Sequence, residues 1–80
     1  MKKGRRCTPG VYVIKGERGI RVGQSICPET RVPRVAKQFE SCIGKAKTVQ
    51  VIPIMDRKAR LTLEKTLIDI FAPKCNLIKR

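Results

Sequence analysis

Glu64 is the acidic residue whose surroundings in the sequence point most directly to chemistry. Apolar residues lie three positions before it and three, four and seven positions after it, namely Leu61, Leu67, Ile68 and Phe71. This is the spacing of one helical face. A carboxylate on such a face is costly to bury unless a cation neutralises it. We therefore expect Glu64 either to pair with a Lys or Arg or to bind a divalent metal ion.

The net charge of the chain limits the class of molecule that it is expected to bind. Nineteen Lys and Arg residues against six Asp and Glu residues give the 80-residue chain a formal net charge of +13. A small domain with this charge attracts polyanions, and nucleic acid releases counterions when it is bound. The basic residues run from Lys2 to Arg80 instead of forming one helical face, and no apolar stretch approaches the ~20 residues of a membrane span. We expect a nucleic acid as partner and no membrane.

The four cysteines do not form a recognisable metal motif. Cys7, Cys27, Cys42 and Cys75 contain no C-x-x-C pair, and the chain has no histidine, so neither a zinc ribbon nor a zinc finger is indicated. Disulfides are one alternative. Because Cys42 continues a helical apolar pattern and no secretory segment precedes the domain, we expect reduced, structural cysteines and a cytoplasmic protein.

The first part of the chain predicts a basic arm followed by a β-hairpin. Residues 1–9 are rich in Lys and Arg and poor in apolar residues, and the domain is expected to span residues 10–80. Residues 11–14 are β-branched or aromatic, which favours a strand. Residues 15–19 have the glycines and charges of a turn, and residues 20–23 form a second short strand.

Two helices and a third strand are expected after the hairpin. A first helix is indicated by Val32, Val35, Ala36, Phe39 and Ile43. Thr30 is a suitable N-cap that would place Pro33 in the first turn, and Gly44 suits the C-terminus. Glu40 lies off the apolar face of this helix.

Residues 48–54 then predict a strand, with Pro53 indicating an edge position. Asp56 can cap a second helix that runs to about Phe71 and is stopped by Pro73. The class is therefore α+β, a single small domain in which an antiparallel three-stranded sheet is flanked by helices.

Several of these segments together resemble the GIY-YIG nuclease family. Gly10-Val11-Tyr12 on the first strand and Arg21-Val22-Gly23 after the turn are similar to the two tripeptides that name the family. Further similarity follows in the family's order at Gly23-Gln24-Ser25, Arg31, the helix around Glu64, and Pro73-Lys74-Cys75-Asn76. The resemblance spans about residues 10–77, and the ordered set is more specific than any single piece.

The resemblance implies a role for each matching residue in metal-dependent cleavage of DNA. Tyr12 would orient or deprotonate the attacking water, Arg31 would hold the scissile phosphate, Glu64 would bind one Mg²⁺ or Mn²⁺ ion, and Asn76 would support the site. A phosphodiester needs a cation at the leaving oxygen, positive charge on the phosphoryl oxygens and a positioned nucleophile. A single carboxylate suffices for Mg²⁺, which keeps several waters.

Two departures from the family pattern bear on the activity. Arg21 replaces the second motif tyrosine, and Val35 occupies the region where many members carry a histidine or tyrosine. Arg21 could donate hydrogen bonds to phosphate, but it stays protonated and cannot act as a base. A DNA-binding module of the same fold without turnover is therefore an alternative to the nuclease.

An unrelated basic RNA-binding protein is a further alternative. Only Tyr12, Phe39 and Phe71 are aromatic, and two of them lie on helical apolar faces, which gives no stacking platform for single-stranded bases. A domain this small has little surface for reading bases, so low sequence specificity is expected, or specificity supplied by dimerisation or a partner protein. The bare nuclease module resembles stand-alone members from phages or mobile elements.

Overall fold

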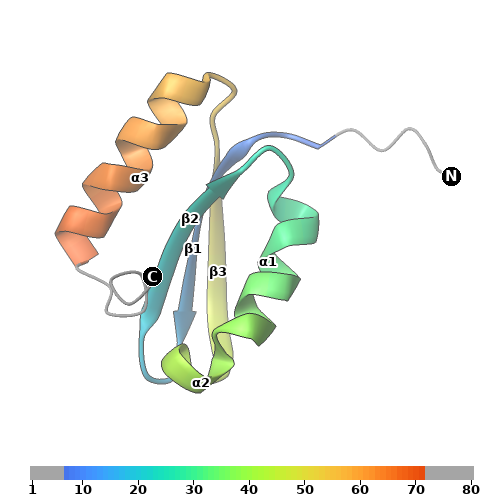
Figure 1. The fold of residues 1–80 in the computed structure, drawn as a ribbon, viewed down its shortest axis with the longest axis vertical. Helices are drawn as coiled ribbons and strands as arrows, with labels where there is room; N and C mark the ends of the chain where they lie inside the picture. The colour runs from blue at the N-terminus through green and yellow to red at the C-terminus, as the bar shows by residue number, and fades with distance from the viewer. Residues whose placement is uncertain (1–6, 72–80) are drawn as a thin grey trace, which may run out of the picture.

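A three-stranded antiparallel sheet forms the centre of the domain, and helices cover both of its faces. The structure is a computed structural model of the 80-residue chain and describes residues 7–71. Its elements are β1 (Gly10–Gly16), β2 (Ile20–Ser25), α1 (Pro28–Gln38), α2 (Glu40–Ile43), β3 (Ala46–Pro53) and α3 (Arg57–Phe71). Figure 1 shows α1 and α2 on one side of the sheet and α3 on the other. The predicted α+β class, with a three-stranded antiparallel sheet flanked by helices, is confirmed.

The strand order is β2-β1-β3, so the most apolar strand occupies the centre. In the register, Tyr12 lies opposite Gly23 on β2 and opposite Val51 on β3. The side chains of β1 alternate between two cores, as strand geometry requires. Tyr12 and Ile14 pack with Val35 and Ile43 below α1 and α2. On the other face, Val11, Val13 and Val22 pack against α3.

Helix α1 begins earlier than the sequence predicts. The cap is Cys27 instead of Thr30, the first helical residue is Pro28, and Pro33 lies inside the helix. Pro28 fits the first position because its missing N–H has no intrahelical partner there. Pro33 costs less than its position suggests because it lies on the exposed side of the helix, where water can bind the carbonyl oxygen that the ring leaves without a donor.

The ends of the helices that follow agree with the predictions. Helix α2 stops at Gly44, whose φ of 81° lies in the left-handed region that favours glycine. At the start of α3, the Asp56 carboxylate accepts a hydrogen bond from the backbone N–H of Ala59 at 2.9 Å. None of the helices in residues 7–71 combines the length and the hydropathy that crossing a membrane requires.

A buried arginine fastens α3 to the sheet. The Arg60 side chain is 5% exposed. Its Nε donates to Oε1 of Gln24 at 3.0 Å, and its Nη1 donates to the carbonyl oxygens of Ile54 and Met55 at 3.3 and 2.9 Å. These acceptors allow a charge to be buried among neutral groups. Sequence reasoning gave Arg60 no role, because arginine is usually exposed and its acceptors are distant in the chain or on the backbone.

Candidate functional site

Tyr12 lies across Gly23 toward the β2 edge of the sheet. A Cβ atom at Gly23 would collide with the hydroxyl and ring carbons of Tyr12, so the tyrosine needs glycine at this position. Only 3% of the Tyr12 residue is exposed. Tyr12 on β1 therefore lies in direct contact with Gly23 on β2.

Arg21 lies on the same face of β2 as Gly23. It lies two residues before Gly23 and opposite Ile14, so its side chain leaves the strand on the α1 side. The Arg21 guanidinium carbon is 4.0 Å from the centroid of the Phe39 ring. This cation–π contact restrains the Arg21 guanidinium beside α1. The role of Phe39 was not foreseen, because its helical spacing explains it as a core residue.

Glu64 is half-buried on α3, and its electrostatics link it to Arg21. Partial burial removes water from the carboxylate and raises the pKa of Glu64 above 4.5, while the positive charge of Arg21 acts in the opposite direction. The side chains that pack α3 on the sheet are Leu63, Leu67 and Ile68. Leu61, which the sequence assigned to the apolar face, is 41% exposed. The apolar face is thus rotated toward Leu63, and Glu64 lies at its border.

Arg31 belongs to a different group of side chains. Within residues 7–71, an open hollow of about 510 Å³ is lined by residues of α1, namely Arg31, Arg34, Val35, Lys37 and Gln38. Three of these five side chains are cationic, which suits an anion such as a backbone phosphate. Tyr12 and Arg21 thus leave the sheet on the α1 side, and the charge of Arg21 acts on Glu64 of α3, whereas Arg31 is grouped with Arg34 and Lys37. Asn76 lies outside the described residues.

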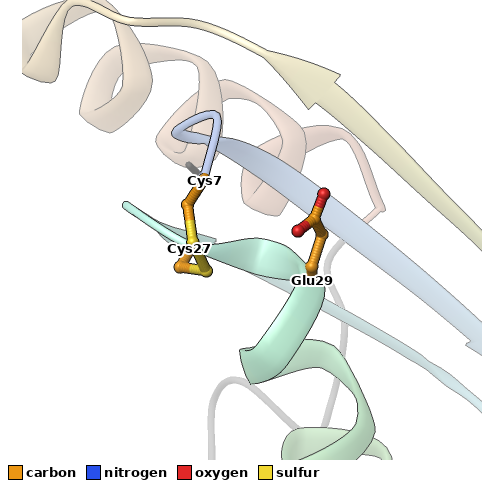
Figure 2. A group of neighbouring side chains, drawn as sticks. All are labelled: Cys7, Cys27 and Glu29. Atoms are coloured by element: carbon orange, nitrogen blue, oxygen red, sulfur yellow. A yellow bond between two sulfur atoms is a disulfide. The ribbon is translucent and has the colours of Figure 1, made fainter. Parts of the chain in front are cut away.

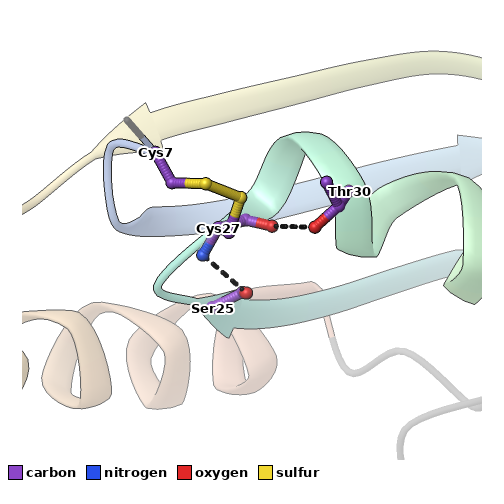
Figure 3. The surroundings of a disulfide bond; sticks show 4 residues. All are labelled: Cys7, Ser25, Cys27 and Thr30. Carbon is purple, nitrogen blue, oxygen red and sulfur yellow. Dashed lines mark hydrogen bonds between the residues drawn. A yellow bond between two sulfur atoms is a disulfide. The ribbon is translucent and has the colours of Figure 1, made fainter. Parts of the chain in front are cut away.

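Two cysteines meet where α1 begins. Cys7 and Cys27 form a disulfide with a Cα–Cα distance of 4.9 Å, and none of the described cysteines is a free thiol. The expectation of reduced cysteines was therefore wrong for this pair, and also for Cys42, which is disulfide-bonded. Figure 3 shows the bond between the segment that precedes β1 and the first turn of α1. Twenty positions separate the two residues in sequence, and only the fold brings them together.

Glu29 adds a carboxylate to this pair. One ligand atom from each of Cys7, Cys27 and Glu29 can be chosen so that all three lie within 4.8 Å of one another. Figure 2 shows the Glu29 side chain beside the two cysteines, at the start of α1. The two cysteines are partly buried and Glu29 is exposed. Sequence reasoning did not group these residues.

Comparisons of the chain with protein-family models, with curated proteins and with solved structures give no match.

Proposed function

We propose that the chain is a divalent-metal-dependent endonuclease that hydrolyses DNA phosphodiester bonds with low intrinsic sequence specificity. The observation that carries the proposal is the position of Glu64, a half-buried carboxylate under the influence of the Arg21 charge. Tyr12 reaches β2 at Gly23, two residues from Arg21 and on the same face of the strand. Tyr12 and Arg21 therefore share the face of the sheet below α1, and the charge of Arg21 acts on Glu64 of α3.

The charges of this group suit a metal ion that is shared with the substrate. Glu64 is partly exposed and can hold Mg²⁺ or Mn²⁺, which keeps several water ligands and takes others from phosphate. The nearby Arg21 charge opposes a free cation, so we expect tight metal binding only when DNA phosphate adds negative charge. The bound ion would supply positive charge at the leaving oxygen.

The remaining groups have roles that need no metal. Arg21 would donate hydrogen bonds to the phosphoryl oxygens, and its contact with Phe39 reduces the entropy lost when it does so. The Tyr12 hydroxyl would orient the attacking water. Arg31, Arg34 and Lys37 line the hollow on α1 and would bind the DNA backbone beside the cleaved bond.

A DNA-binding module without turnover is the second candidate, and the burial of Tyr12 favours it. At 3% exposure, the tyrosine needs a local rearrangement before its hydroxyl can meet water or phosphate. The formal charge of +13 supports backbone binding in either case.

The two candidates separate in a plasmid assay. Purified protein is incubated with supercoiled plasmid with Mg²⁺, with Mn²⁺, and with a chelator, and relaxed or linear product is expected only with metal. Glu64→Gln should lower the rate by about a hundredfold or more, because it keeps the shape and removes the charge that holds the ion. Glu40→Gln, the same change at an exposed residue of α2, is the matched control.

Thermal melting without metal completes the experiment. Glu64→Gln should keep the fold, so its melting temperature should not fall. If wild type binds the plasmid tightly and cuts with neither metal, the binding module is the correct function. If Glu64→Gln melts far lower and cuts normally for its folded fraction, Glu64 has a structural role and the catalytic assignment is wrong.

A further inference from the structure

The Cys7, Cys27 and Glu29 side chains form a second cluster that is independent of the proposed nuclease site. Their ligand atoms lie within 4.8 Å of one another, and they come from two segments on either side of the hairpin. Thiolates and a carboxylate are the donors that bind zinc in proteins. Three such donors and one open position also match the ligand count of a four-coordinate ion with a bound water.

Hydrogen bonds that are separate from the disulfide restrain the backbone at Cys27 and near Cys7. The backbone N–H of Cys27 donates to Oγ of Ser25 at 2.9 Å, and the Cys27 carbonyl oxygen accepts from Oγ1 of Thr30 at 3.2 Å. Near Cys7, the carbonyl oxygen of Pro9 accepts from the backbone N–H of Ile54 at 2.9 Å. None of these bonds involves a sulfur atom.

The charge of the loaded cluster suits its place in the fold. Two thiolates and one carboxylate carry three negative charges, and a divalent ion leaves a net charge of −1. Cys27 is the N-cap of α1, where the helix dipole favours negative charge. A net negative group is also favoured in a chain of charge +13.

We propose that the reduced protein binds one Zn²⁺ ion through Cys7, Cys27 and Glu29, and that the disulfide and the zinc complex are alternative states of one site. A dithiol reductant transfers two electrons and two protons to the disulfide, which becomes two thiols while the dithiol becomes a disulfide. Zn²⁺ then displaces the two thiol protons and forms two Zn–S bonds. Both states tie the segment before β1 to the start of α1.

The test is metal titration of the full-length reduced chain. The protein is reduced with a phosphine, which is converted to its oxide, and is titrated anaerobically with Co²⁺ and then with Zn²⁺. We expect one ion per chain, a thiolate-to-cobalt charge-transfer band in the near ultraviolet, and its loss when Zn²⁺ displaces Co²⁺. The oxidised protein should bind neither ion at this site.

Three variants assign the ligands. Cys27→Ser should weaken Zn²⁺ binding by about a hundredfold or more, and Glu29→Gln by about tenfold, because each removes an anionic donor. Glu29→Gln changes an exposed side chain and leaves both thiols, so it is informative even if Cys27→Ser fails to fold. Cys42→Ser, a cysteine outside the cluster, is the control and should bind like wild type.

Two results would overturn the proposal. One is a reduced, folded wild-type protein that binds no Zn²⁺ at micromolar concentration, with folding checked by circular dichroism. The other is binding that survives Cys27→Ser and Glu29→Gln unchanged, or that depends on Cys42 instead. None of these measurements uses DNA, so they remain valid whether or not the chain cleaves it.

Discussion

The two edges of the sheet differ in how strongly their neighbours constrain them. Helices α1 and α3 make their main contacts with β1 and β2. Val22 and Gly23 of β2 are buried, whereas every residue of β3 is exposed, including Val49, Val51 and Ile52. Two of the residues proposed for chemistry, Tyr12 and Arg21, lie on these covered strands. The comparison shows that the packing constraints of this sheet are concentrated on β1 and β2.

The largest effect is expected at Gly23. In Gly23→Ala the new Cβ collides with the Tyr12 hydroxyl, and the buried ring has to move. We expect a loss of about 1–3 kcal/mol in the free energy of unfolding, the range of overpacked cores. Urea denaturation followed by circular dichroism measures it.

The control for Gly23 lies on the open edge. Thr48→Ala on β3 is exposed and should change the free energy of unfolding by no more than about 0.5 kcal/mol. Equal denaturation midpoints for wild type and Gly23→Ala would mean that the Tyr12 ring is not held over β2.

A second difference between the edges is expected in DNA binding. Arg21→Ala removes the guanidinium fixed on Phe39, whereas Lys47→Ala removes a charge from exposed β3. We expect Arg21→Ala to weaken binding of a short duplex by about tenfold, or about 1.4 kcal/mol, and Lys47→Ala by less. Fluorescence anisotropy at one fixed salt concentration compares them. Equal losses would remove Arg21 from the site.

The pH dependence of stability tests the desolvation of Glu64. The pKa of Glu64 in the folded state is raised above 4.5. Between pH 4.5 and this folded pKa, Glu64 is therefore protonated in the folded state but already ionised in the unfolded state. The contribution of Glu64 to stability is therefore fully present below pH 4.5 and is lost as pH rises through the folded pKa. Metal-free Glu64→Gln should gain stability relative to wild type across this window.

The difference in melting temperature between metal-free Glu64→Gln and wild type, measured from pH 4 to pH 7, checks this prediction. If the melting temperature of wild type instead rises relative to that of Glu64→Gln as pH increases, attraction to Arg21 outweighs desolvation of the carboxylate. That result would support the ion-pair interpretation of Glu64.

The smallest effect is expected at Val51. Val51→Thr replaces a methyl by a hydroxyl at a site that is 46% exposed, and the free energy of unfolding should change by less than about 0.5 kcal/mol. Val22→Thr makes the same change at a fully buried residue of β2 and should cost about 1–3 kcal/mol. A large loss at Val51 would mean that β3 is covered in solution.

Features that depend on neighbouring residues were predictable from the sequence. The hairpin, the cap at Asp56 and the stop at Gly44 follow from strand propensity, a side-chain acceptor and backbone freedom, all of which act over a few residues. The position of Pro53 correctly indicated an edge strand. Helical spacing placed Glu64 within the apolar face of its helix, whereas the structure has Glu64 partly buried at the border of that face.

Features that depend on distant partners were missed. The start of α1 was misplaced because Pro33 argued against an early start, and the exposure that makes it tolerable comes from the tertiary structure. The disulfide between Cys7 and Cys27 joins two residues 20 positions apart, one before β1 and one after β2, which only the folded hairpin brings together. Spacing alone could not distinguish Leu61 from Leu63 as the packed residue, because the sheet decides the rotation of α3.

Arg60 has a consequence for the angular alignment of α3. Glu64 lies one turn after Arg60, so the two side chains leave the helix on nearly the same side. A slip by one residue would turn Glu64 by about 100° about the helix axis, away from the β2 edge. Such a slip would also pull the guanidinium from the three oxygens that hold it. The hydrogen bonds of Arg60 thus fix the rotation of α3 about its axis and with it the direction of the Glu64 side chain. Apolar contacts of leucine and isoleucine are not directional and fix this rotation less well.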